Sequence, residues 1–249
     1  MILPLLGGAA VAVAAGYNTM APRSQLYGRT FIGERSSSRR LALTFDDGPN
    51  HPHTLALLDV LARHGVRATF FMLGRHARQC PEIVRAVAQA GHAIGNHSYS
   101  HPNMIFCSTG QIRQQIQTCA DALNDAVGET SRLFRPPFGG RRPAVLRAVR
   151  KLGYEPVMWS VTAGDWRATS PEQIEHAVAR QLRGGDVILL HDGGHQRLGE
   201  DRSHSVRATD AILRRCLGQG YTFVTVPEMM AAAATKNGGL AWMSADSEN

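Results

Sequence analysis

The sequence contains 249 residues with a formal net charge of +7, and 43% of its residues are hydrophobic. This length fits one large domain, and the apolar fraction suits a folded core but is too low for a protein with many membrane spans. The positive charge comes from arginines scattered along the chain, without a dense basic block and interleaved aromatic residues, so nucleic-acid binding is not predicted.

The N-terminus is apolar. Residues 2–22 contain no charged side chain, and we interpret them as a membrane anchor or an export signal. The arginines that follow would favour the cytoplasmic side of a membrane, which conflicts with export and leaves the side open. The alternative is an apolar tail that packs on the domain. We expect residues 23–39 to form a linker, residues 40–234 the folded domain and residues 235–249 a loose tail.

From residue 41 onward, short apolar segments alternate with segments of helical periodicity. Strands are predicted at residues 41–45, 68–74, 92–97, 132–137, 155–161, 186–191 and 221–226. Helices are predicted at residues 53–64, 81–90, 111–127, 143–151, 171–181, 207–217 and 227–234. This alternation predicts an α/β protein with a parallel sheet buried on both faces. The number of units is close to that of a TIM-barrel-like (β/α) barrel, and a doubly wound open sheet is the alternative.

Polar residues follow the C-terminal ends of the predicted strands. They are Asp46 and Asp47 after the first strand, His97 and His101 after the third, Arg135 in the fourth, Asp165 after the fifth and His191 at the end of the sixth. Barrels of this kind build their active sites from this end of the sheet, so we expect these side chains to share one site.

The segment HSYSH places His97 and His101 four residues apart. Alone, such a pair is more often two solvated histidines, but with a carboxylate from a neighbouring strand end it forms a triad with open coordination positions. This pattern predicts a catalytic site for one divalent transition metal, with zinc expected and cobalt, nickel or manganese as alternatives. One of Asp46 and Asp47 would bind the metal, and the other would act as a general base.

Further roles are predicted for residues near this site. Arg135 would neutralise a carboxylate, unless it forms an ordinary surface ion pair. The FRPPFGG segment fixes a backbone amide that can donate to an oxyanion. His191 is interpreted as a general acid or as a satisfied core residue. Asp165 and Trp166 would orient His191 and form a wall of the groove, or serve only a turn and packing.

The segments TFDDG, HSYSH, FRPPFG, DW and ILLHD, in this order and spacing, resemble the five motifs of the NodB-homology polysaccharide deacetylases, carbohydrate esterase family 4. The resemblance covers roughly residues 41–230. It implies a distorted (β/α) barrel, often with seven strands, which uses one metal to remove N-acetyl groups from chitin-type or peptidoglycan sugars.

The resemblance also implies roles by position. They are Asp46 as the base, Asp47, His97 and His101 as metal ligands, Arg135 as support for the base, the Phe138 backbone N–H as an oxyanion donor, His191 as the acid, Asp165 as its tuning partner and Trp166 as the groove wall. The chain departs from the family pattern at Phe138, where tyrosine is usual, and at Thr162, where aspartate is common.

The expected function is therefore a hydrolase that removes N-acetyl groups from a glycan containing N-acetylglucosamine, a chitooligosaccharide or peptidoglycan. The expected location is the cell envelope, membrane-anchored or secreted, with the cytoplasmic face left open. The alternatives are a deformylase of a lipid-linked aminosugar and a non-catalytic sugar-binding barrel. A phosphate-ester hydrolase is disfavoured because ligands for a second metal are missing. The loop at residues 193–204 borders His191 and is a candidate specificity element; the sequence does not predict the oligomeric state.

Overall fold

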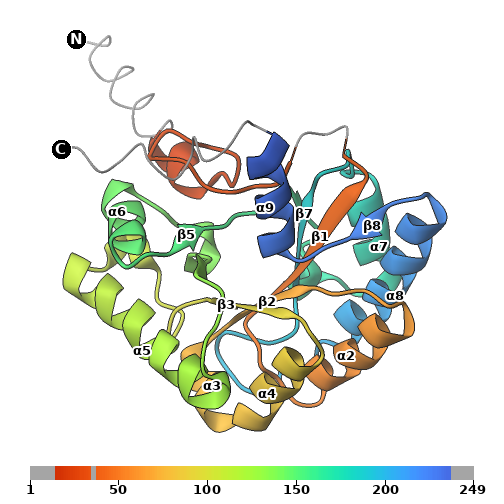
Figure 1. Ribbon diagram of the computed structural model, residues 1–249, viewed down its shortest axis with the longest axis horizontal. Coiled ribbons are helices and arrows are strands. Elements are labelled where there is room, and N and C mark those ends of the chain that lie inside the picture. Colours follow the sequence, from red (N-terminus) through yellow and green to blue (C-terminus); the bar gives the residue numbers. More distant parts are fainter. Residues whose placement is uncertain (1–14, 35–37, 237–249) are drawn as a thin grey trace.

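The computed structural model describes residues 15–34 and 38–236, and its strands form a curled parallel sheet (Figure 1). The strands are β1 (Arg40–Asp46), β2 (Thr69–Met72), β3 (Ala93–Asn96), β4 (Leu133–Phe134), β5 (Glu155–Pro156), β6 (Val161–Thr162), β7 (Val187–His191) and β8 (Thr222–Phe223). Their order is β5-β4-β3-β2-β1-β7-β6, and β8 pairs with the start of β1. The predicted distorted (β/α) barrel is confirmed.

Most of the helices surround the curled sheet, whereas the last helix lies over the middle of the ring of strands (Figure 1). The helices are α2 (His53–Arg63), α3 (Gly74–Gln79), α4 (Pro81–Gln89), α5 (Thr109–Val127), α6 (Pro143–Lys151), α7 (Pro171–Ala179), α8 (Ser203–Gly218) and α9 (Val226–Lys236). Local sequence explains several starts, because Ser108 and Gln111 form a capping box at α5 and the Ser170 hydroxyl accepts from the Gln173 N–H at α7.

Two details of the predicted element order were wrong. The strand expected at residues 155–161 is divided into β5 and β6, so eight strands are present among the described residues instead of seven. The two parts pair with different neighbours, β5 with β4 and β6 with β7, and Val157 between them forms an isolated bridge with Phe31 of the N-terminal segment. Helix α3 was not predicted. It begins at Gly74, the last residue of the segment 68–74 that was expected to be a strand.

Strand β1 forms the centre of the core. All its residues except Arg40 are buried, as expected for a parallel strand covered on both faces. The ring of Phe45 stacks on that of Phe70 in the neighbouring β2, with ring centroids 5.1 Å apart. Burial of these apolar side chains stabilises the sheet by roughly 1.5–3 kcal/mol for each large residue. The polar residues that follow β1 therefore extend from a rigid strand.

The N-terminal segment packs against the barrel. Residues 15–20 are helical, Phe31 pairs with Val157, and Gly33 pairs with Asp186 at the start of β7. The buried Arg141 donates to the carbonyl oxygens of Ala21 and Ser24, and its backbone N–H donates to Thr19. The segment is thus joined to the polar loop that follows β4.

Most of the apolar segment assigned to residues 2–22, and residues 237–249 of the expected tail, lie outside the described residues. Within the described part of the chain, no helix has both the length and the apolar character needed to cross a membrane.

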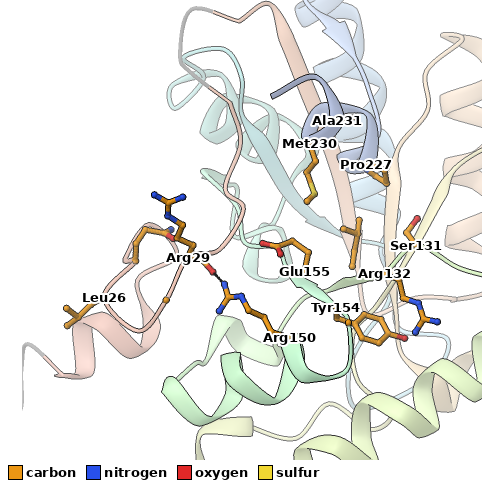
Figure 2. A pocket seen from close by; sticks show the side chains of 14 residues that line it. Leu26, Arg29, Ser131, Arg132, Arg150, Tyr154, Glu155, Pro227, Met230 and Ala231 are labelled. Carbon is orange, nitrogen blue, oxygen red and sulfur yellow. Dashed lines mark hydrogen bonds between the residues drawn. The ribbon is translucent and has the colours of Figure 1, made fainter. Parts of the chain in front are cut away.

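A cavity of about 870 Å³ lies near the N-terminal ends of β4 and β5. Figure 2 shows Leu26 and Arg29 of the N-terminal segment, Arg150 and Glu155 on one side and Met230 of α9 on the other. It contains none of the predicted site residues, which lie at the C-terminal ends of the strands.

Candidate active site

The two adjacent carboxylates at the end of β1 have different partners. The Asp46 Oδ1 accepts a hydrogen bond of 2.7 Å from the Arg135 guanidinium, which also donates to the Thr44 hydroxyl at 2.8 Å. The Arg135 side chain is fully buried and lies 4.0 Å from the centroid of the Phe71 ring. The alternative interpretation of Arg135, an ordinary surface ion pair, is excluded because its side chain is buried. Burial lowers the pKa of Arg135, and the adjacent Asp46 carboxylate opposes this change.

Asp47 faces the two histidines. Its Oδ1 lies 3.5 Å from the Nε2 of His97 and 3.4 Å from the Nε2 of His101. One ligand atom from each of the three residues lies within 4.8 Å of the others, and all three residues are buried. These distances are too long for good hydrogen bonds and leave space for an ion between the atoms.

The chemistry of the three groups fits a divalent cation. The Asp47 Oδ1 is buried and has no hydrogen-bond partner among the described residues. Burial raises the pKa of Asp47 to about 7 and lowers the pKa of His97 to about 4, and burial also lowers the pKa of His101. Neutral imidazoles bind metals through a free lone pair, and a cation at this position would keep the carboxylate ionised.

The backbone holds His97 and His101 in position through two different contacts. The Nδ1 of His97 lies 2.8 Å from the Arg135 carbonyl oxygen, an arrangement that directs the Nε2 toward Asp47. The backbone N–H of His101 donates to the Ser98 hydroxyl at 3.1 Å. His101 has a φ of +62° and follows a bend at residues 99–100, so the spacing of four residues between the histidines does not correspond to a helical turn.

His191 lies at the end of β7, opposite Asp46 in the strand register. Its Nδ1 is 2.9 Å from the Asp165 Oδ1, while its backbone N–H and the Ser205 hydroxyl donate to the Asp165 Oδ2 at 2.8 and 2.7 Å. Burial has the largest single effect and lowers the pKa of His191. The attraction and hydrogen bond of the Asp165 carboxylate, together with the charges of Asp47 and Asp46, outweigh burial and raise the pKa to about 9. The half-exposed Trp166 contacts the His191 ring edge-on, with centroids 5.1 Å apart.

Phe138 lies in the loop that follows β4, in the single turn η2 (Pro137–Gly139). Its φ of +57° is uncommon for a residue with a side chain, and Pro136, Pro137 and Gly139 surround it. Its half-exposed ring contacts the His101 ring edge-on at 4.4 Å. The structure therefore brings all nine predicted site residues to the C-terminal ends of the strands.

The sequence did not identify several residues around this site. The Thr44 hydroxyl accepts from Arg135, and the Ser205 hydroxyl donates to Asp165. Thr44 is the first residue of the quoted TFDDG motif but was given no role, and Ser205 lies outside every motif. Asp192 lies in the quoted ILLHD motif, is fully buried and accepts from the Thr54 hydroxyl. Burial raises the pKa of Asp192 to about 7. His195, in the loop after β7, stacks on His101. The sequence analysis named this loop as a candidate specificity element but did not single out His195.

Comparison with known proteins points to one family. A family model described as polysaccharide deacetylase matches residues 33–157. The chain is 38% identical over 205 residues to a peptidoglycan-N-acetylglucosamine deacetylase of Bacillus cereus, covering 82% of this chain and 72% of that protein. It is 35% identical over 199 residues to a chitooligosaccharide deacetylase of Rhizobium leguminosarum bv. trifolii, covering 78% of this chain and 93% of that protein. The crystal structure of the Bc1960 peptidoglycan N-acetylglucosamine deacetylase is similar, with a TM-score of 0.74, 37% identity and coverage of 80% of this chain and 92% of that chain.

Proposed function

This chain belongs to the polysaccharide deacetylase family, and on that basis we propose that it hydrolyses the N-acetyl groups of a glycan containing N-acetylglucosamine, either a chitooligosaccharide or peptidoglycan. The observation that carries the proposal is the buried Asp47, His97 and His101 triad, with Asp46 paired to Arg135 beside it and His191 paired to Asp165. This set supplies a metal site, a base and an acid.

The triad would hold one divalent metal, which would lower the pKa of a bound water and polarise the amide carbonyl. Two imidazoles and a carboxylate suit zinc first, and cobalt, nickel and manganese are the alternatives. The triad leaves coordination positions open for water and substrate, as catalytic sites do.

The protein's own groups would move the protons. Asp46 accepts the proton of the attacking water, and Arg135 fixes the orientation of its carboxylate. The Phe138 N–H donates a hydrogen bond to the oxyanion that develops as the new C–O bond forms. His191 then donates a proton to the nitrogen as the C–N bond breaks, and Asp165 holds the imidazole for this step. The products are a free amine and acetate.

A cell-envelope location follows from the same proposal. The relatives named above are deacetylases of peptidoglycan and of chitooligosaccharides, and the apolar residues 2–22 would provide an anchor or an export signal. Fractionation of cells that express the full chain tests this location, and recovery of the protein only in the cytosolic fraction would contradict it.

The catalytic proposal is tested by product release from the purified full chain. We would offer chitin oligomers, peptidoglycan fragments and a formylated aminosugar, each with added zinc or cobalt and with a chelator. Chelator-sensitive acetate release is expected, and Asp46→Asn should keep the metal but lose turnover. Formate release alone would favour the deformylase alternative. Metal binding without any product would favour the sugar-binding barrel.

A further inference from the structure

The ring of His195 lies against the metal triad. His195 comes from the loop after β7, and its side chain is 37% exposed. Its ring stacks on the His101 ring with centroids 4.5 Å apart and an interplanar angle of 28°. Its Nδ1 lies 3.9 Å from the Asp47 Oδ2, the carboxylate oxygen that is not shared with His97 and His101. One side chain thus stacks on one triad residue and lies close to a second.

The loop that carries His195 is anchored at several points. The Asn50 amide donates to the carbonyl oxygens of Asp192 and Glu200, at 2.9 and 2.8 Å. The Arg202 Nε donates to the Gly193 carbonyl oxygen at 2.7 Å, and the Arg75 guanidinium donates to the carbonyl oxygen of His195 itself. These contacts fix the backbone on both sides of His195, so the position of its ring beside the triad is built into the fold.

Gly193 shows how closely this loop approaches the triad. A Cβ atom at Gly193 would collide with the carbonyl oxygen of Asp47. The loop backbone therefore lies directly against the residue that supplies the carboxylate ligand, and only glycine fits there.

The three triad residues differ in their outer contacts. His97 has the Arg135 carbonyl as a hydrogen-bond partner. The Oδ1 of Asp47 and the Nδ1 of His101 are both buried without a hydrogen-bond partner among the described residues. Residues that bind a metal normally have outer partners that orient them, and loss of such a partner typically weakens metal affinity about 10–100-fold. His195 is the side chain placed to serve both Asp47 and His101.

We propose that His195 is a positioning residue of the metal centre, which orients Asp47 through its imidazole nitrogen while its ring supports His101. A small rotation of the His195 side chain would close the gap of 3.9 Å to hydrogen-bond distance. The inference rests on the proposed metal site. It predicts that His195 affects metal affinity, an effect separate from any contact with the sugar.

Metal affinity is the measurement that tests it. We would titrate zinc into the metal-free full chain with a competing chelator and record the visible spectrum of the cobalt form. His195→Ala and His195→Phe are expected to weaken zinc binding about 10-fold or more and to change the cobalt spectrum. His195→Asn, which places an amide N–H near the position of Nδ1, is expected to recover most of the affinity. The control is His204→Ala, because His204 contacts Arg207 and lies outside the ring cluster.

Two results would contradict the role proposed for His195. Unchanged zinc affinity in His195→Ala would overturn the inference, and so would full affinity in His195→Phe, because stacking alone would then suffice. A wild-type chain that binds no metal would contradict the proposed function itself. Thermal denaturation of the metal-free variants separates a specific loss of affinity from a general loss of folding.

Discussion

Replacement of Asp165 with asparagine is expected to move the alkaline limit of activity to lower pH. His191 acts in the proposed reaction as a proton donor, so kcat/KM falls as the pH rises through its pKa. Burial lowers that pKa, whereas the Asp165 carboxylate and, to a smaller extent, Asp47 and Asp46 raise it, so that it reaches about 9 from an ordinary value of 6.5. Without the carboxylate charge, burial acts with less opposition, and we expect a pKa at or below the ordinary value.

The size of the effect follows from the two pKa values. Near pH 8, an imidazole of pKa about 9 is roughly 90% protonated, whereas one of pKa about 6.5 is roughly 3% protonated. The variant should therefore lose about 30-fold in kcat/KM near pH 8 and progressively less as the pH falls toward 6. A bound metal would lower the pKa of His191 in both proteins, so the difference between their profiles is the quantity to compare.

Asparagine preserves most of the local structure. Its oxygen can accept from the His191 N–H and the Ser205 hydroxyl, as the Asp165 Oδ2 does, while its amide faces the His191 Nδ1. The assay is acetate release measured from about pH 5 to 10, with stability checked by thermal denaturation. A loss of equal size at every pH would refute the reasoning, because Asp165 would then act only through orientation and not through charge.

Three further predictions follow from the same contacts. Asp47→Ala should abolish metal binding and activity, whereas Asp46→Ala should retain the metal without turnover. Metal content and acetate release check both variants. Full activity in Asp46→Ala would exclude Asp46 as the base. Arg135→Met should lower the free energy of unfolding, measured with denaturant, by about 3–5 kcal/mol, because the buried Asp46 carboxylate loses its partner. A decrease below about 1 kcal/mol would show that the ion pair is not needed for stability. Removal of residues 1–23 should cost about 1–3 kcal/mol, because the buried Arg141 loses acceptors, and an unchanged Tm would contradict this.

Much of the fold could be predicted because the local pattern and the tertiary structure agree. The apolar run before Asp46 is a central strand with both faces covered, and its composition alone indicates this. The segment at residues 155–161 is divided because its two halves pair with different strands, β4 and β7, while Val157 pairs with Phe31, more than a hundred residues earlier in the chain. A pattern within a window of a few residues carries no information about such a partner.

The same distinction applies to the site. Asp46, Asp47 and His191 could be predicted because parallel strands bring their C-terminal ends to one edge of the sheet. No role could be assigned to Thr44 or His195, because the partner of Thr44 is a guanidinium from a distant part of the chain and His195 lies in a loop anchored by Asn50 and Arg202. A single histidine in a loop rich in glycine and polar residues has no periodicity that distinguishes it from a solvated one.

Backbone strain is concentrated at the residues that would do the chemistry. Among the described residues, those other than glycine with positive φ are Asp47, Ser98, His101 and Phe138, with φ values of +73°, +73°, +62° and +57°. Each such conformation costs about 1–3 kcal/mol and persists only where the surrounding structure enforces it. Two of the four belong to the metal triad, one caps the His101 N–H, and one carries the proposed oxyanion donor. Asp47 directly follows the buried part of β1, and Arg135 pairs with Asp46 beside it, so we expect the packing of the core to maintain these conformations.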